Sequence, residues 1–131
     1  MAQARMLNKT ISLSKKLAML KSDSARLLYT WLIPHLDIQG RFYADVDIIK
    51  GNVVPKLKMT TRKIAAYLNE LAEVGLIKLY KADGEFYLQL ENFKHFQILR
   101  EDREAPSKIP PPEKCEPREL QENSRRTPAL N

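Results

Sequence analysis

Cysteine and histidine are scarce in this chain of 131 residues, which contains one cysteine, Cys115, and two histidines, His35 and His95. A single thiol cannot form an internal disulfide, and these three residues do not have the spacing of a metal-binding motif. We interpret Cys115 as a surface thiol and His35 as a partly exposed residue at a helix end. The sequence therefore predicts no metal site and no cofactor.

The sequence also lacks the motifs of the common enzyme classes and of membrane proteins. It has no Gly-rich phosphate loop and no Gly-x-Ser-x-Gly, and its carboxylates are scattered over expected caps, turns and helix surfaces. No apolar run approaches the roughly 20 residues that a membrane helix needs, and the N-terminal MAQARMLNKT lacks the apolar segment of a secretory signal. We expect a cytoplasmic protein that is not an enzyme and has no membrane partner.

Positive charge is abundant, and it is unevenly distributed. Residues 1–96 contain 15 Lys and Arg against 9 Asp and Glu, whereas residues 97–131 contain 7 of each. The formal net charge of +6 therefore belongs to the first part of the chain. Because Lys and Arg gain free energy by displacing the counterions condensed on phosphates, this excess favours a polyanionic partner.

The stretch from residue 45 to residue 90 has the clearest periodicity. Asp45 can cap a short helix over residues 46–53, which Pro55 ends. A turn follows, in which Leu57 is expected to fill the angle between this helix and the next. The next helix begins at Thr61, and its apolar residues recur at the spacing of one buried face. These residues are Ile64, Leu68, Leu71 and Ala72.

A hairpin is expected after the longer helix. Gly75 ends that helix, because glycine readily takes the left-handed conformation that closes helices. Two apolar, β-prone runs then flank Asp83-Gly84, which is a strong signal for a two-residue hairpin turn. A short strand at Phe42 and Tyr43 is expected to pair with the edge of this hairpin.

Two further helices are predicted before the short strand. Residues 12–20 place Leu13, Leu17 and Leu20 on one side, and residues 25–36 form a second helix that Ser22-Asp23-Ser24 caps and Pro34 shortens. Trp31 is expected in the core. Residues 1–10 form an irregular arm, in which Arg5 and Lys9 either touch a phosphate backbone or stay solvated.

This order of elements predicts a mainly α fold with a small antiparallel β wing, which is a winged helix-turn-helix over residues 1–99. Residues 100–131 are polar and contain several prolines, with few apolar residues to bury. We expect a disordered or extended tail there. The polyproline run at residues 110–112 favours a spacer, and a docking peptide for a partner protein is the alternative.

The predicted contact with double-stranded DNA is centred on the longer helix. In helix-turn-helix proteins the N-terminal part of the second helix meets the base edges, while flanking cations contact the phosphates. Tyr67 and Asn69 either read bases or form an interface with a partner protein. The alternative for all the polar residues of this helix is that they are simply its solvated face. The predicted DNA-binding residues are Lys56, Lys58, Thr60, Thr61, Arg62, Lys63, Tyr67, Asn69, Lys78 and Lys81.

Several segments carry a family resemblance. They are LLYTWLIPHLD at residues 27–37, GRF at 40–42 before AD at 44–45, LAEVGLI at 71–77 and PSKIPPP at 106–112. Over roughly residues 5–112 the chain resembles the N-terminal winged-helix domain of phage replication initiators and replisome organisers, including DnaD-like proteins. Those proteins usually carry a second, C-terminal domain that binds DNA or the helicase loader. Here a short polar tail stands in its place, so we do not expect the resemblance to include helicase loading.

The resemblance implies a phage or prophage protein that binds DNA in replication initiation or its control, in the cytoplasm of the host cell. It also implies self-association through the N-terminal region. Two other roles remain open, since winged helices also serve in transcription and in protein contacts. These are a phage transcriptional regulator and a module for protein interaction or dimerisation.

Overall fold

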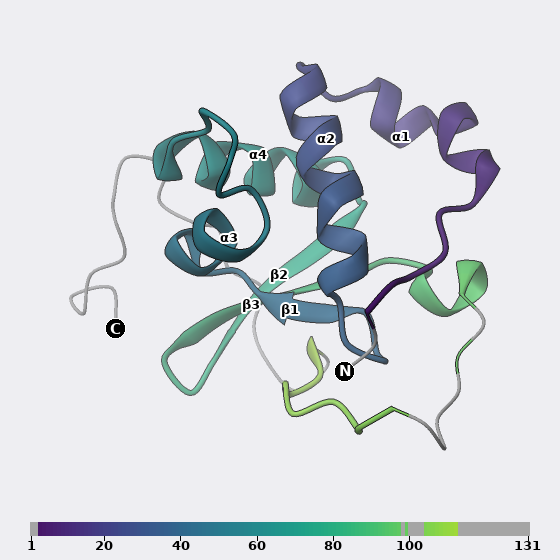
Figure 1. The fold of residues 1–131 in the computed structure, drawn as a ribbon, viewed down its shortest axis with the longest axis vertical. Coiled ribbons are helices and arrows are strands. Elements are labelled where there is room, and N and C mark those ends of the chain that lie inside the picture. The colour runs from purple at the N-terminus through teal and green to yellow at the C-terminus, as the bar shows by residue number, and fades with distance from the viewer. Residues whose placement is uncertain (1–2, 98, 100–103, 113–131) are drawn as a thin grey trace.

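The structure, a computed structural model, describes residues 3–97, 99 and 104–112. Helices gather on one side of a small sheet (Figure 1). The helical elements are the 3-10 helix η1 (Lys9–Leu13), α1 (Lys15–Ala18), α2 (Asp23–Leu32), the 3-10 helix η2 (Ile33–His35), α3 (Val46–Asn52), α4 (Thr61–Glu73) and the 3-10 helix η3 (Phe93–Phe96). The strands are β1 (Arg41–Tyr43), β2 (Ile77–Ala82) and β3 (Glu85–Leu90).

Short polar side chains begin the helices where the sequence predicted. The side chains of Ser22 and Asp45 accept hydrogen bonds from the first backbone amides of α2 and α3, and Thr60 does the same for α4. Such caps satisfy amides that have no partner inside the helix. Pro34 stands in η2 directly after α2, so the predicted shortening of that helix is confirmed.

The strands form a three-stranded antiparallel sheet in the order β1-β3-β2. Asp83 and Gly84 connect β2 to β3 and both have positive φ, 52° and 81°. This is the backbone that a tight hairpin turn of the primed type requires, and it explains why Asp-Gly stands there. The predicted pairing of the short strand with the hairpin edge is confirmed by Phe42 lying opposite Leu88.

The two faces of the sheet have different partners. Phe42, Leu79 and Leu88 share the inner face and belong to the hydrophobic core with the buried residues of α2, α3 and α4. The outer face carries Tyr80 and Tyr87, which lie opposite each other in the β2–β3 register. The helices therefore cover only the inner face.

Two apolar side chains, Leu13 and Trp31, are on the surface, although Trp31 was expected in the core and Leu13 on the same helix side as Leu17 and Leu20. Leu13 is 79% exposed and Trp31 is 40% exposed. Leu13 ends η1 instead of lying in a helix continuous with Leu17, so its predicted periodicity is wrong. Trp31, three residues after the buried Leu28, lies at the edge of the buried side of α2, where its ring is only partly covered.

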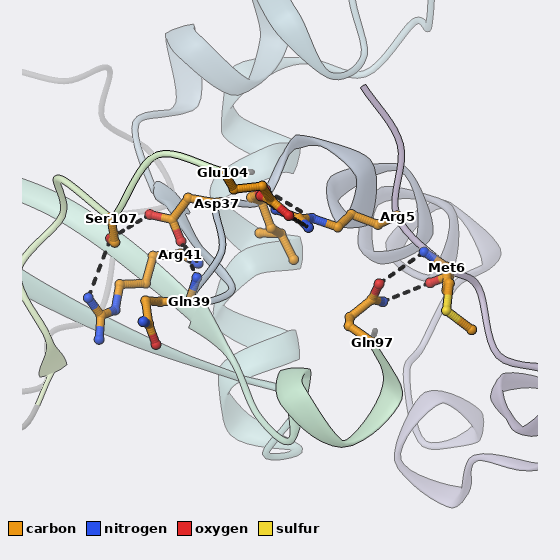
Figure 2. A network of polar contacts seen from close by, with 9 residues as sticks. Arg5, Met6, Asp37, Gln39, Arg41, Gln97, Glu104 and Ser107 are labelled. Carbon is orange, nitrogen blue, oxygen red and sulfur yellow. Dashed lines mark hydrogen bonds and ion pairs between the residues drawn. The ribbon is translucent and has the colours of Figure 1, made fainter. Parts of the chain in front are cut away.

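Residues 104–112, which we call the C-terminal strap, run along the outer side of the sheet (Figure 1). The hydroxyl of Tyr80 donates to the carbonyl oxygen of Pro110 at 2.7 Å, and Nη1 of Arg41 donates to that of Ile109 at 2.9 Å. Ser107 donates to a carboxylate oxygen of Asp37 at 2.6 Å, as Figure 2 shows. The side chain of Ile109 is buried.

The strap packs against the sheet although it lies beyond residue 99, where the predicted winged-helix segment ends. Contacts with the sheet continue to Pro110, because Arg41 and Tyr80 donate to the strap carbonyls, and the side chain of Ile109 is buried. The remaining residues of the predicted tail, 100–103 and 113–131, lie outside the described residues.

A second contact joins the strap to the N-terminal segment. The guanidinium of Arg5 makes two parallel hydrogen bonds, 2.6 and 2.7 Å long, to the carboxylate of Glu104 (Figure 2). The same guanidinium donates to the carbonyl oxygen of Leu36 at 3.2 Å. The Arg5 side chain is only 3% exposed, so both expectations for it, a phosphate contact and a solvated side chain, are wrong.

This ion pair predicts a pH dependence of stability. The hydrogen bonds from Arg5 hold the pKa of Glu104 below its usual value in the folded protein. A carboxyl group whose folded pKa is lowered stabilises the fold above its unfolded pKa, about 4.3, and that contribution is lost as the pH falls through the folded pKa. In urea denaturation, Glu104→Gln should therefore destabilise the protein at pH 7, and its difference from the parent should shrink below about pH 4.

The control for this prediction is the same change in a chain that lacks the guanidinium. In an Arg5→Gln background, Glu104→Gln should have a smaller effect at pH 7, because the two residues act as a pair. Equal effects of Glu104→Gln in both backgrounds would show that the ion pair does not contribute to the stability of the fold.

Candidate nucleic-acid interface

Buried apolar side chains and one lysine fix the turn between α3 and α4. Val54 and Met59 are buried, whereas Leu57, the predicted filler of the angle, is only half-buried. The ammonium group of Lys50 donates to the carbonyl oxygens of Val54 and Leu57. Lys50 thus neutralises the C-terminal end of α3 and fixes the path of the turn.

Sequence reasoning missed Lys50, although a signal was present. A lysine in the last turn of a short helix is well placed to bind carbonyl groups that the helix leaves free. Because both Lys50 contacts are to backbone atoms of the turn, this cation supports the geometry of α4 and is not a candidate contact with DNA.

The first turn of α4 presents two cations. The Thr60 hydroxyl accepts a hydrogen bond from the amide of Lys63 at 3.2 Å, which starts the helix at Thr61. Arg62 and Lys63 are exposed, and α4 has no acidic residue in its first turn. Neither cation forms an ion pair within the described residues. Their charges add to the positive end of the helix dipole, so this end attracts anions.

The buried side of α4 is the one that the sequence predicted. Ile64, Leu68 and Leu71 have no exposed surface, while Ala65 is buried and Ala72 is half-buried. Arg62 and Glu73 lie on the opposite side, eleven residues or three helical turns apart. The exposed side of α4 is therefore basic at its N-terminal end and acidic at its C-terminal end.

The middle of α4 is less available than the sequence suggested. Glu70 accepts a hydrogen bond from the amide of Lys21 at 3.3 Å, so its carboxylate faces the connection between α1 and α2. Tyr67 is half-buried against the core, and Asn69 already has an interaction partner. These contacts leave the first turn as the most open part of the helix.

The two hairpin lysines lie on opposite faces of the sheet. Side chains alternate along a strand, and Lys78 and Lys81 are three residues apart in β2. Lys81 shares its side with Leu79, toward the helices, and its ammonium lies 5.6 Å from the centre of the Phe86 ring. Lys78 lies on the outer face, 3.9 Å from a carboxylate oxygen of Glu91.

The structure therefore brings together some of the predicted site and separates the rest. The residues around the turn and the first helical turn of α4 are exposed at Lys56, Lys58, Thr60, Arg62 and Lys63 and half-buried at Thr61. The tip of the hairpin and the α3–α4 turn both project toward the left of Figure 1. Lys78 is on the face away from α4 and is not part of this group.

Among the residues that the structure describes, no group of three or more His, Cys, Asp or Glu side chains is arranged to hold a metal ion. None of the described helices is both long enough and apolar enough to cross a membrane.

Comparison with protein-family models, with curated proteins and with solved structures found no match for this chain.

Proposed function

We propose that the chain is a winged helix-turn-helix protein that binds double-stranded DNA, with α4 as the recognition helix. The observation that carries this proposal is the first turn of α4, where Arg62 and Lys63 are exposed, unpaired with any described acid, and next to the positive end of a 13-residue helix. The element order supports it, since a helix pair is followed directly by a hairpin whose sheet also takes in β1.

Each part of the site has a role in this proposal. Arg62 and Lys63 enter the major groove with the N-terminal end of α4. Lys56 and Lys58 in the turn contact phosphate oxygens of one strand, and Lys81 contacts those of the other. Glu73 stays outside the groove, because its carboxylate is repelled by phosphates. The helix therefore enters at an angle, with its first turn deepest.

The biological role that we propose rests on the resemblance in the sequence. The segments shared with phage replication initiators and replisome organisers favour a phage or prophage protein acting in replication initiation or its control. Transcriptional control is a second role that the same DNA contact permits. An interaction module is the competing function, in which the basic surface is incidental.

The salt dependence of binding tests the proposal against the interaction module. If Lys56, Lys58 and Lys81 contact phosphates, the logarithm of the affinity for a random duplex should fall by about 3 for each unit in the logarithm of the salt concentration. We would measure binding of the full chain by fluorescence anisotropy in a KCl series. Binding that is absent at low salt, or that does not change with salt, would contradict a phosphate contact.

A further inference from the structure

A hollow of about 530 Å³ lies among the N-terminal segment, η1, α1, α2 and η3. None of the residues proposed to contact DNA lines it. Its volume lies within the range of roughly 300 to 1,000 Å³ that is usual for binding sites in proteins. The DNA-binding proposal gives this hollow no role.

Exposed apolar side chains are concentrated at the hollow. Met6, Leu7, Leu13 and Phe96 line it and are 46%, 55%, 79% and 38% exposed. Leu17, Leu76 and Phe93, which are core residues, form part of its lining. A continuous apolar surface that begins in the core and ends in exposed side chains marks an interaction site, because isolated domains rarely leave such surface in water.

Tyr29 also lines the hollow. The Tyr29 hydroxyl has no hydrogen-bond partner among the described residues, although its side chain packs partly against the core. Burial raises the pKa of Tyr29, so the hydroxyl keeps its proton at neutral pH. It is available to donate one hydrogen bond to a group that enters the hollow.

Several backbone groups around the hollow are already paired. The side chain of Gln97 binds both backbone groups of Met6, accepting from its amide at 3.0 Å and donating to its carbonyl oxygen at 2.8 Å (Figure 2). At the strand ends, the amide of Glu91 donates to Leu76 at 3.0 Å. These paired groups do not accept an added strand, so an occupant that satisfies its own backbone, as a helix does, fits this part of the lining.

The rim of the hollow is positively charged. Lys15 and Lys16 line it, and neither forms an ion pair within the described residues. Lys16 is held at the rim because its ammonium donates to the carbonyl oxygen of Gly75 at 3.2 Å. Glu91 also lines the hollow, but Lys78 stands 3.9 Å from its carboxylate and offsets its charge.

We propose that this hollow is a docking groove for one amphipathic helix of a partner protein, which buries its apolar face against Leu13 and Phe96 and places acidic side chains beside Lys15 and Lys16. The exposed apolar lining fits the apolar face of the partner, and the paired backbone groups favour a helix over a strand. The two lysines favour acidic side chains along the edge of that helix. This interaction does not depend on DNA binding by α4.

The test uses the isotopically labelled full chain and two synthetic helical peptides of about 15 residues. The acidic peptide has leucines along one face and glutamates beside them, and the basic peptide has lysine in place of each glutamate. The acidic peptide should shift the amide signals of Met6, Leu13 and Phe96 and should bind about tenfold more tightly than the basic one, as expected for a few rim charge pairs.

Two variants sharpen the test without disturbing the core. The double change Lys15→Glu with Lys16→Glu should reverse the preference between the peptides, and Leu13→Glu should abolish binding of the acidic peptide, since both sites are exposed. Signals of the buried core residues report that each variant keeps its fold.

Three results would overturn the proposal. The first is equal binding of the two peptides, or shifts that lie outside the hollow. The second is a dimer of the free chain that Leu13→Glu dissociates, because a second copy would then occupy the groove. The third is laurate displacing the acidic peptide at equal concentration, which would make the hollow a site for small amphiphiles.

Discussion

Replacing Leu68 by alanine is expected to lower the free energy of unfolding by about 2 to 5 kcal/mol. Leu68 has no exposed surface and belongs to the core that joins α4 to the inner face of the sheet and to the other helices. The change removes buried methyl groups and leaves a cavity that the neighbouring side chains fill only in part. A domain of this size has a total stability of about 5 to 15 kcal/mol, so a large part of it is lost.

Leu13→Ala is the matched control for Leu68→Ala, because it makes the same chemical change at a side chain that is 79% exposed. Its effect should stay within about 0.5 kcal/mol. Urea denaturation of the two variants and the parent measures the difference. Should Leu68→Ala unfold at the same urea concentration as Leu13→Ala, the buried side of α4 would have been assigned to the wrong residues.

The second large effect concerns DNA. The double change Arg62→Ala with Lys63→Ala is expected to weaken binding to a selected duplex by about 1 to 3 kcal/mol, or roughly 5- to 150-fold, if either side chain reads a base. Both side chains are exposed and outside the core, so the fold should be retained. Binding is measured to a selected duplex and to a random duplex, and the difference between the two affinities should become smaller.

Lys78→Ala serves as the control, because it removes a lysine from the face of the sheet away from α4. It should leave the affinity for both duplexes unchanged, whereas Lys81→Ala should lower both alike and reduce the salt slope by about one unit. If Lys78→Ala weakened binding as much as the change at Arg62 and Lys63, the outer sheet face would be the DNA contact.

The parts of the fold that the sequence predicted are those with local signals. Thr60 and the spacing of the buried residues mark the start and the inner side of α4. Asp83 and Gly84 tolerate the positive φ of the hairpin turn. In each case the residues that determine the local structure lie close together in the sequence, so one short stretch is enough to predict it.

The packing of the strap could not be predicted from any one stretch of sequence, because it depends on residues far apart in the chain. Ile109 lies in a polar, Pro-containing segment, and it is buried because Arg41 and Tyr80, far away in the sequence, bind the carbonyl groups beside it. Arg5 likewise finds Glu104, 99 residues later in the chain. Composition alone therefore classified this segment as part of a tail.

The separation of the two hairpin lysines could have been predicted. Lys78 and Lys81 are an odd number of residues apart in an expected strand, and an odd spacing places side chains on opposite faces. The loss of Glu70 from the open surface could not, because it depends on the α1–α2 connection lying beside α4.

The central claim is that the first turn of α4 is where DNA binds, and the most direct measurement is an amide chemical-shift titration of the full chain with a duplex. We expect the largest shifts at Thr61, Arg62 and Lys63, smaller shifts at Lys56 and Lys58, and none at Lys78. Largest shifts at Met6, Leu13 and Phe96, with the α4 signals unmoved, would contradict it.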